Sequence, residues 1–330
     1  MAEYKDIHGT NIEVVSSDPS NPILGQVWYN TTSQVLKGFS SNPAGSWATS
    51  TAMNTGKQTT TGSGTKDAAI VFGGQISTGY TTTTEVWDGS SWTEVNDLNT
   101  ARDGMFVSSA GPSTATLGWG GRESDPTVSS KVESWDGTDW TETTDINTAR
   151  AFGSGSGTQT AALAFGGASI PLPGSSKDET ETWNGSSWTE VGDLNTARFY
   201  IAGAGASNTA ALGWGGYDGS SYVNSCESWN GSAWTEVNNI NNAGGQSGEA
   251  GTSSSMIKMG GGPGARAYTE EWNGTSWTEV NDLNTARSGG GSAGSSTAAR
   301  YSGGYTATAI TDVSEAWTAP TQTTVTFTVS

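Results

Sequence analysis

Cysteine and histidine are almost missing from this chain. Its 330 residues include one cysteine, Cys226, and one histidine, His8. A single cysteine excludes an internal disulfide and a cysteine-based zinc site. A single histidine excludes histidine-based metal clusters and most arrangements that need a general base. We therefore expect no metal site and no cofactor.

Positive charge is also in short supply. Lys and Arg together number 14 against 32 Asp and Glu, which gives a formal net charge of −18. An acidic surface repels phosphate backbones and anionic lipid, so nucleic acid and membrane surfaces are poor partners. The simplest role of the charge is to keep the protein soluble.

Long apolar runs are absent as well. No stretch approaches the ~18 apolar residues of a membrane helix, and the first residues, MAEYKDIHGTNIEVV, have no secretory apolar core. We expect no signal peptide and no membrane insertion.

Glycine and tryptophan, by contrast, are abundant, with 47 and 15 copies. Aromatic side chains suit the pleated surface of a sheet, and glycine weakens helices. This composition favours an all-β fold whose core packs large rings against glycine-rich backbone.

One unit repeats along the chain. The segment EVWDGSSWTEVNDLNTAR (85–102) returns with small changes at 132–150, 180–198, 226–244 and 269–287. Its leading Trp lies at positions 87, 135, 183, 229, 272 and 317, and a Gly-Gly pair after a short apolar run also occurs six times. A period of this length indicates a repeat architecture.

Each unit contains four short strand-like pieces. A Gly/Ser/Ala-rich strand comes first, then an apolar run without alternation, the E-x-W strand and the S-x-W-T-E-V strand. Asp-Gly or Asn-Gly joins the last two, which is a strong hairpin signal because both residues tolerate positive φ. Four antiparallel strands in about 45 residues match a propeller blade.

These motifs resemble the kelch repeat. The resemblance lies in Gly-Gly, Glu-x-aromatic, then Trp, an apolar residue six positions later and Arg four after that, as in Trp92–Leu98–Arg102. The fourth unit departs from it, because Gly244 stands where Arg is expected. The resemblance covers residues ~46–318 and implies a six-bladed kelch-like β-propeller, while it implies almost nothing about activity.

The two chain ends fall outside the repeat. We expect residues 46–51 to supply the outer strand of the last unit, with 324–330 as the alternative. Residues 25–39 predict a β-hairpin that can pair with 324–330 into a small accessory sheet. The chain then divides into an N-terminal segment (1–45), the propeller (46–318) and a C-terminal strand (319–330).

The N-terminal piece, with Pro22, Gly25, WYNTT and LKGF, is similar to short segments of bacteriophage virion proteins near the start of tail or fibre chains. The resemblance implies attachment to a particle. Trp28, Tyr29 and Phe39 are the candidate attachment residues.

The repeated charged and aromatic residues predict structure rather than chemistry. The Glu of each E-x-W strand is expected to accept hydrogen bonds from backbone or from the repeated Arg. The repeated basic residues are expected to tie one blade to the next, and the Trp pairs to pack between blades. The four arginines concerned are Arg102, Arg150, Arg198 and Arg287. No Ser/His/Asp set, Walker motif or dinucleotide fingerprint occurs, so we expect no enzyme activity.

The connections after each Gly-Gly differ in length and chemistry, and loops of this kind carry binding but also tolerate drift. In a kelch-like propeller they rise on one face, which would there present Tyr80, Arg122, Asp125, Tyr217, Tyr222, Tyr268 and Tyr305.

Three functions of different classes are therefore candidates: a virion component, a lectin and an intracellular adaptor. The leading hypothesis is a structural or binding component of a bacteriophage virion, such as a tail, fibre or capsid-attached protein. Its expected partners are other virion proteins or a glycan or protein receptor on the host surface. Its N-terminal segment could also join copies of the chain. The alternative is a carbohydrate-binding adhesin or lectin that uses the variable loops. An intracellular kelch-type adaptor usually has an extra interaction domain, for which this chain has no room.

Overall fold

The protein is all-β. The computed structural model describes residues 12–22, 26–41, 45–172, 176–320 and 322–327, and every regular element in these ranges is a strand. The expected fold class is confirmed at this level. No helix in the described ranges is long and apolar enough to cross a membrane. The chain divides into two compact units, Met1–Gly45 with Ala319–Ser330 and, separately, Ser46–Thr318.

The second unit contains six four-stranded antiparallel sheets within its described residues. The first three sheets, in chain order, are β5 (Thr61–Gly64), β6 (Ala69–Phe72), β9 (Thr84–Trp87) and β10 (Trp92–Val95); β11 (Phe106–Val107), β12 (Thr116–Trp119), β15 (Val132–Trp135) and β16 (Trp140–Thr143); β17 (Ser154–Thr158), β18 (Ala161–Phe165), β19 (Thr180–Trp183) and β20 (Trp188–Glu190). The other three are β21 (Ala202–Ser207), β22 (Ala210–Trp214), β23 (Cys226–Trp229) and β24 (Trp234–Val237); β25 (Gly248–Thr252), β26 (Ser255–Met259), β27 (Thr269–Trp272) and β28 (Trp277–Val280); β29 (Gly291–Ser295), β30 (Ala298–Ser302), β31 (Ser314–Thr318) and β4 (Ser46–Ser50).

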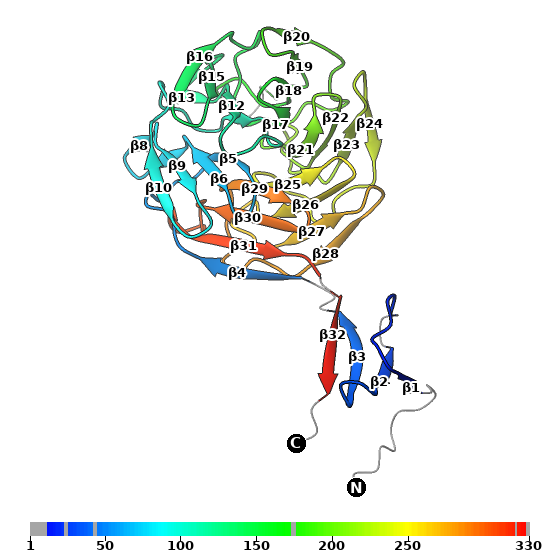
Figure 1. Ribbon diagram of the computed structural model, residues 1–330. Helices are drawn as coiled ribbons and strands as arrows, with labels where there is room; N and C mark the ends of the chain where they lie inside the picture. Colours follow the sequence, from blue (N-terminus) through cyan, green and yellow to red (C-terminus); the bar gives the residue numbers. More distant parts are fainter. Residues whose placement is uncertain (1–11, 23–25, 42–44, 173–175, 321, 328–330) are drawn as a thin grey trace. The chain divides into compact units, whose positions relative to one another are not determined.

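The first strands of the sheets lie around a common centre (Figure 1). They contact one another in the order β5, β11, β17, β21, β25 and β29, and β29 in turn contacts β5. Small residues permit this approach: at Gly155 a β-carbon would collide with the Val107 carbonyl oxygen and the Trp119 ring. The arrangement is consistent with a β-propeller.

Asp-Gly and Asn-Gly turns close the outer hairpin of five of the sheets. Between β9 and β10, the Asp88 carboxylate accepts hydrogen bonds from the amides of Ser90 and Ser91, both at 2.8 Å. Gly89 has a φ of 101°, which a side chain would resist. The turn places Trp87 directly opposite Trp92, as the predicted hairpin requires.

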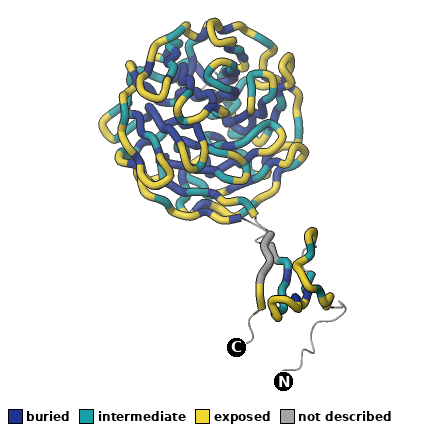
Figure 2. The backbone as a smooth tube through the Cα atoms, in the orientation of Figure 1, coloured by how far each residue is buried: buried dark blue, intermediate teal, exposed yellow. Residues whose placement is uncertain are grey.

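The repeated tryptophans pack between neighbouring sheets. Trp135 and Trp140 of the second sheet lie in one buried cluster with Ile70 and Phe72 of the first. The rings of Phe72 and Trp140 are 4.6 Å apart. Figure 2 shows many buried residues inside this unit and exposed ones along much of its outline. The expected packing between repeats is confirmed.

The last sheet takes its fourth strand from the start of the unit. β4 pairs antiparallel with β31, with Trp47 opposite Trp317. Trp47 also donates a hydrogen bond from its indole nitrogen to the Thr269 hydroxyl at 3.2 Å. The expectation for residues 46–51 is thus confirmed. The alternative, residues 324–330, is wrong, because the described part of that segment pairs elsewhere.

The first unit is a separate four-stranded sheet. Its strands, in spatial order, are β1 (Glu13–Val15), β2 (Val27–Asn30), β3 (Val35–Ser41) and β32 (Gln322–Phe327). β1 and β2 are parallel, while β3 is antiparallel to both β2 and β32. The expected pairing between the N-terminal hairpin and the C-terminal strand is confirmed over Gln322–Phe327; residues 328–330 of the predicted strand lie outside the described residues.

Asp18 organises one side of the first unit. Its carboxylate accepts hydrogen bonds from the Trp28 indole at 3.1 Å, Asn30 at 2.7 Å and the Lys37 ammonium at 2.7 Å. These donors, Lys37 first, lower the pKa of Asp18 to about 2. Trp28 is fully buried, so it holds this unit together and offers no surface for attachment.

Candidate functional site

Most of the repeated charged residues form buried ion pairs. Arg102 pairs with Glu133 at 2.7 Å, and Arg150 pairs with Glu181 at the same distance. Equivalent pairs are Lys57–Glu85 at 3.3 Å, Arg198–Glu227 at 2.6 Å and Arg287–Glu315. In each pair the basic residue lies on the segment entering a sheet, and the Glu lies on that sheet's third strand. These residues therefore fasten successive sheets and face no ligand.

The fifth sheet, where Gly244 stands in place of the repeated basic residue, has a substitute cation. Glu270, on β27, pairs with Lys258 of the neighbouring strand β26 at 3.3 Å. Arg266 donates a hydrogen bond to the Ala243 carbonyl at 2.6 Å, next to Gly244. Lys258 and Arg266 together thus replace the single basic residue of the other sheets. Lys258 pairs with the buried Glu270 carboxylate, and Arg266 donates to the backbone.

A ring of six residues lies just before the first strands, each two positions after the repeated basic residue or its equivalent. We call it the collar; its members are Thr59, Gly104, Phe152, Tyr200, Gln246 and Gly289. From Gly104 onward, each collar amide donates a hydrogen bond to the carbonyl of the preceding member, at 2.6–2.9 Å. The Thr60 amide completes the cycle by donating to the Gly289 carbonyl at 3.2 Å.

The collar backbone is left-handed throughout. Its φ values lie between 46° at Thr59 and 66° at Gly289. Two members are glycine, for which this conformation is unstrained, but a bulky side chain there costs on the order of 1 kcal/mol. Strained positions of this kind cluster at functional sites. The aromatic rings of Phe152 and Tyr200 are thus placed where the backbone alone would favour glycine.

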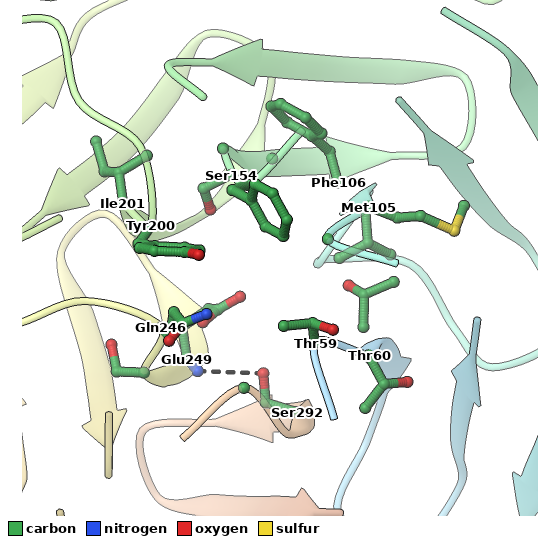
Figure 3. Close-up of a pocket in the computed structure, with 18 of the residues that line it drawn as sticks. Thr59, Thr60, Met105, Phe106, Ser154, Tyr200, Ile201, Gln246, Glu249 and Ser292 are labelled. Atoms are coloured by element: carbon green, nitrogen blue, oxygen red, sulfur yellow. Dashed lines mark hydrogen bonds between the residues drawn. The ribbon is translucent and has the colours of Figure 1, made fainter. Parts of the chain in front are cut away.

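The collar surrounds a pocket (Figure 3). Its volume is about 80 Å³, and all six collar residues line it together with polar residues in or next to the first strands. These include Ser247, Glu249 and Ser292. The Glu249 amide donates a hydrogen bond to the Ser292 hydroxyl at 3.1 Å, which joins β25 to β29 beside the pocket.

Glu249 is the one acidic side chain that lines this pocket. Its carboxylate has no hydrogen bond or ion pair within the described part of the chain. Burial raises its pKa from 4.5 to about 8. Near neutral pH the Glu249 carboxyl can therefore lose or gain its proton.

Two of the predicted loop residues lie beside the collar. Tyr80 is on the short strand β8 (Gly79–Tyr80), and Arg122 begins β13 (Arg122–Ser124). The Arg122 guanidinium lies 4.9 Å from the centre of the Tyr80 ring and 5.3 Å from that of Phe152. It also donates two hydrogen bonds to the buried Asp103, at 2.9 and 3.0 Å. Arg122 is therefore held by a bidentate ion pair and packs against the aromatic ring of the collar residue Phe152.

Two further predicted residues join the same aromatic cluster from the other side. The ring of Tyr217 lies 5.3 Å from Tyr222 and 5.2 Å from Phe199. Phe199 contacts Tyr200 at 4.8 Å, and Tyr200 contacts Phe152 at 5.1 Å. Burial raises the pKa of Tyr200 to about 12, so its hydroxyl stays protonated. The cluster runs without a break from Arg122 to Tyr222.

The remaining predicted loop residues do not pack in this cluster. Asp125 is exposed, although its charge acts on Tyr80 and Arg122. Tyr268 is 37% exposed, with the Arg266 guanidinium 5.8 Å from its ring centre. Tyr305 forms isolated bridges with Ser288 and Ile310. Within the described ranges neither tyrosine makes a ring contact with the cluster.

The first unit carries its own exposed apolar surface. Val14, Tyr29, Leu36 and Phe327 lie directly opposite one another across its four strands. Residues in such a register share one face of a sheet. We call this set the apolar row; Val14 is 66%, Phe327 47% and Tyr29 36% exposed. Phe39, the third predicted attachment residue, is half-buried and lies outside the row.

Sequence reasoning missed Phe152, Phe199, Tyr200, Gln246 and Glu249. A usable signal was present at the positions after the repeated Arg, which read Asp-Gly and Ser-Gly in two units but Ala-Phe and Phe-Tyr in two others. Glu249 interrupts a strand type that elsewhere contains only small or apolar residues. Residues that depart from the repeat at positions facing the centre of the unit therefore indicate the candidate site.

Of the two hollows between the first strands, the one at the collar end has the acidic and aromatic lining residues. The opposite ends of the first strands line a wider hollow of about 500 Å³, formed by Gly, Ala, Ser, Thr and Pro residues alone. No group of three or more His, Cys, Asp or Glu able to hold a metal ion occurs in the described residues. The collar pocket with its aromatic cluster is the candidate site. Searches of protein-family models and of curated proteins find no match to the chain.

Proposed function

We propose that the chain is a non-enzymatic binding and structural component of a bacteriophage particle, in which a closed six-bladed kelch-like propeller is attached through a small end sheet. The propeller presents its collar face to a partner protein or host receptor. The end sheet contacts other virion proteins or further copies of the chain. The apolar row is the observation that carries the attachment role.

The closed propeller is supported by the collar. Its hydrogen bonds run through all six repeats and return to the first one. An open arrangement would leave one apolar face of the first sheet and one of the last sheet without a neighbouring sheet to cover it. The strand β4, donated from the start of the unit to its last sheet, supports the same conclusion.

The attachment role follows from the two faces of the end sheet. On one face Trp28 is buried and Asp18 gathers three donors. The other face bears the apolar row, whose members lie side by side and not scattered. Contiguous exposed apolar residues on a small sheet mark an interaction surface. The phage setting rests on the similarity of the N-terminal piece to segments of virion proteins.

Two tyrosines of equal exposure test the attachment. Tyr29 lies in the apolar row and is 36% exposed, while Tyr268 lies on the propeller unit and is 37% exposed. In particles assembled with the variant chain, we expect Tyr29→Ser combined with Val14→Ser to lower the copies per particle at least about tenfold, because both side chains lose their buried contact area. Tyr268→Ser should leave the copy number unchanged. Equal incorporation of all three chains would contradict the attachment role.

The second candidate is carbohydrate binding at the collar face. The rings of Tyr217 and Tyr222, with Phe152 and Tyr200, offer the apolar platforms on which sugars stack. If the chain is a virion component that is bound only through its end sheet, we expect the purified full-length protein to bind no glycan on an array. A signal that is lost in Tyr222→Ala and retained in Tyr268→Ala would instead establish the lectin function.

A further inference from the structure

We propose that the collar pocket binds a primary alkylammonium group, with the Glu249 carboxylate as its counter-ion. The proposed function assigns no ligand to this pocket, so the inference goes beyond it. The argument rests on an unpartnered acid, a set of neutral acceptors, aromatic walls and the pocket's size.

Glu249 needs a cation that the described chain does not supply. Lys258 stands directly opposite it on β26, but the Lys258 ammonium lies 3.3 Å from Glu270. On the other side, β29 offers only the hydroxyl of Ser292, which already accepts the Glu249 amide. An ionised carboxylate in such surroundings is costly unless it is paired. A bound cation removes that cost.

The other lining groups select for an ammonium ion. Hydroxyls of Thr59, Ser247 and Ser292 and the amide of Gln246 can accept hydrogen bonds, and an ammonium has three to donate. The rings of Phe152 and Tyr200 suit an alkyl chain and a positive charge. No Lys or Arg lines the pocket, so it does not favour an anion. Calcium and magnesium need more oxygen ligands than one carboxylate with neutral groups provides.

The volume sets the size of the ligand. A water needs about 10–15 Å³ measured in this way, so 80 Å³ holds roughly five waters. n-Butylammonium has a comparable number of heavy atoms and reproduces the end of a lysine side chain. A quaternary ammonium of similar size has no N–H, so it cannot satisfy the hydroxyl acceptors.

Binding should depend on pH through Glu249. In the empty pocket the pKa of its carboxyl is about 8, and the cation pairs only with the ionised form. Of the other titratable groups in this region, Lys258 stands opposite Glu249 but pairs with Glu270. Tyr200 and Tyr301 have pKa values raised by burial to about 12 and stay neutral. Affinity should therefore rise about tenfold per pH unit below pH 8 and level off above it.

Calorimetric titration of the full-length protein with n-butylammonium tests the proposal. At pH 8 we expect saturable one-to-one binding, at least tenfold tighter than that of tetramethylammonium, and no binding of n-butanol. Glu249→Gln should abolish the signal. The exposed Glu279→Gln, on β28, should leave it unchanged. Equal binding by the Glu249→Gln protein, or an affinity independent of pH between 6 and 8, would overturn the proposal.

The source of the ammonium is separated by a second titration. A peptide with one central lysine is compared with free n-butylammonium and with the same peptide carrying acetyl-lysine. Tighter binding of the lysine peptide identifies a partner protein's lysine as the ligand, whereas tighter binding of the free amine identifies a small amine. Equal binding of the lysine and acetyl-lysine peptides would contradict an ammonium site.

Discussion

Replacing Arg150 by methionine is expected to lower the free energy of unfolding of the propeller unit by about 3 kcal/mol. Arg150 and Glu181 are both essentially inaccessible to solvent, and their ion pair measures 2.7 Å. Removal of one partner from a buried pair typically costs about 3–5 kcal/mol, because the remaining charge has no counter-ion. Glu181 keeps hydrogen bonds from the Asn147 amide and side chain, both at 2.8 Å, which places the loss at the lower end.

A second ion pair, on the connection just before β19, supplies the control. Lys177 and Glu179 are 2.9 Å apart, but their side chains are 28% and 22% exposed. Lys177→Met should therefore cost less than about 1 kcal/mol. Chemical denaturation of the two variants compares them directly. Similar losses would show that burial does not set the strength of these pairs, and the double variant Arg150→Met/Glu181→Gln should recover part of the loss.

In the fifth sheet the buried ion pair is kept although the repeated arginine is lost. Gly244 replaces the repeated Arg, yet Glu270 is not left alone, because Lys258 reaches it from the adjacent strand. No repeated spacing connects Lys258 with Glu270, which lies 12 residues later and beyond the Gly-Gly pair. What each sheet retains is a buried carboxylate with a cation, and the position of that cation can change.

The repeat made the sheets predictable. Asp-Gly turns, E-x-W strands and the stray Trp47 are local signals with strict spacing, and they correctly placed β4 beside β31. The attachment residues were less predictable. An aromatic in a short strand can face either side, and only the register shows that Trp28 is buried while Tyr29 joins the apolar row.

The candidate site was hardest to predict because its residues come together only at the centre of the unit. Phe152, Tyr200, Gln246 and Glu249 belong to three different repeats, and each precedes or lies in a first strand made mainly of small residues, a composition that predicts a structural role. The variable loops drew attention instead, and only Tyr80, Arg122, Tyr217 and Tyr222 among their residues reach the aromatic cluster. Pattern and spacing describe one sheet at a time, whereas the pocket depends on all six.

Glu249 should make the propeller unit lose stability as pH rises. In the unfolded chain its carboxyl ionises near 4.5, but in the folded protein the pKa is about 8. Between these values the unfolded state releases a proton that the folded state keeps, so the free energy of unfolding falls with pH until the carboxyl ionises in both states. The full shift corresponds to about 5 kcal/mol. Because the group faces a pocket that can admit water, we expect about 2–4 kcal/mol.

The Glu249→Gln variant isolates this effect from every other titration. Glutamine resembles the protonated acid, so both proteins should be about equally stable at pH 5, while the variant should be more stable by about 2–4 kcal/mol at pH 9. Urea denaturation at the two pH values measures the difference. Parallel stability curves would mean that the carboxyl is solvated in the folded state. At pH 9, n-butylammonium should restore stability to the wild-type protein alone, because a ligand stabilises only the state that binds it.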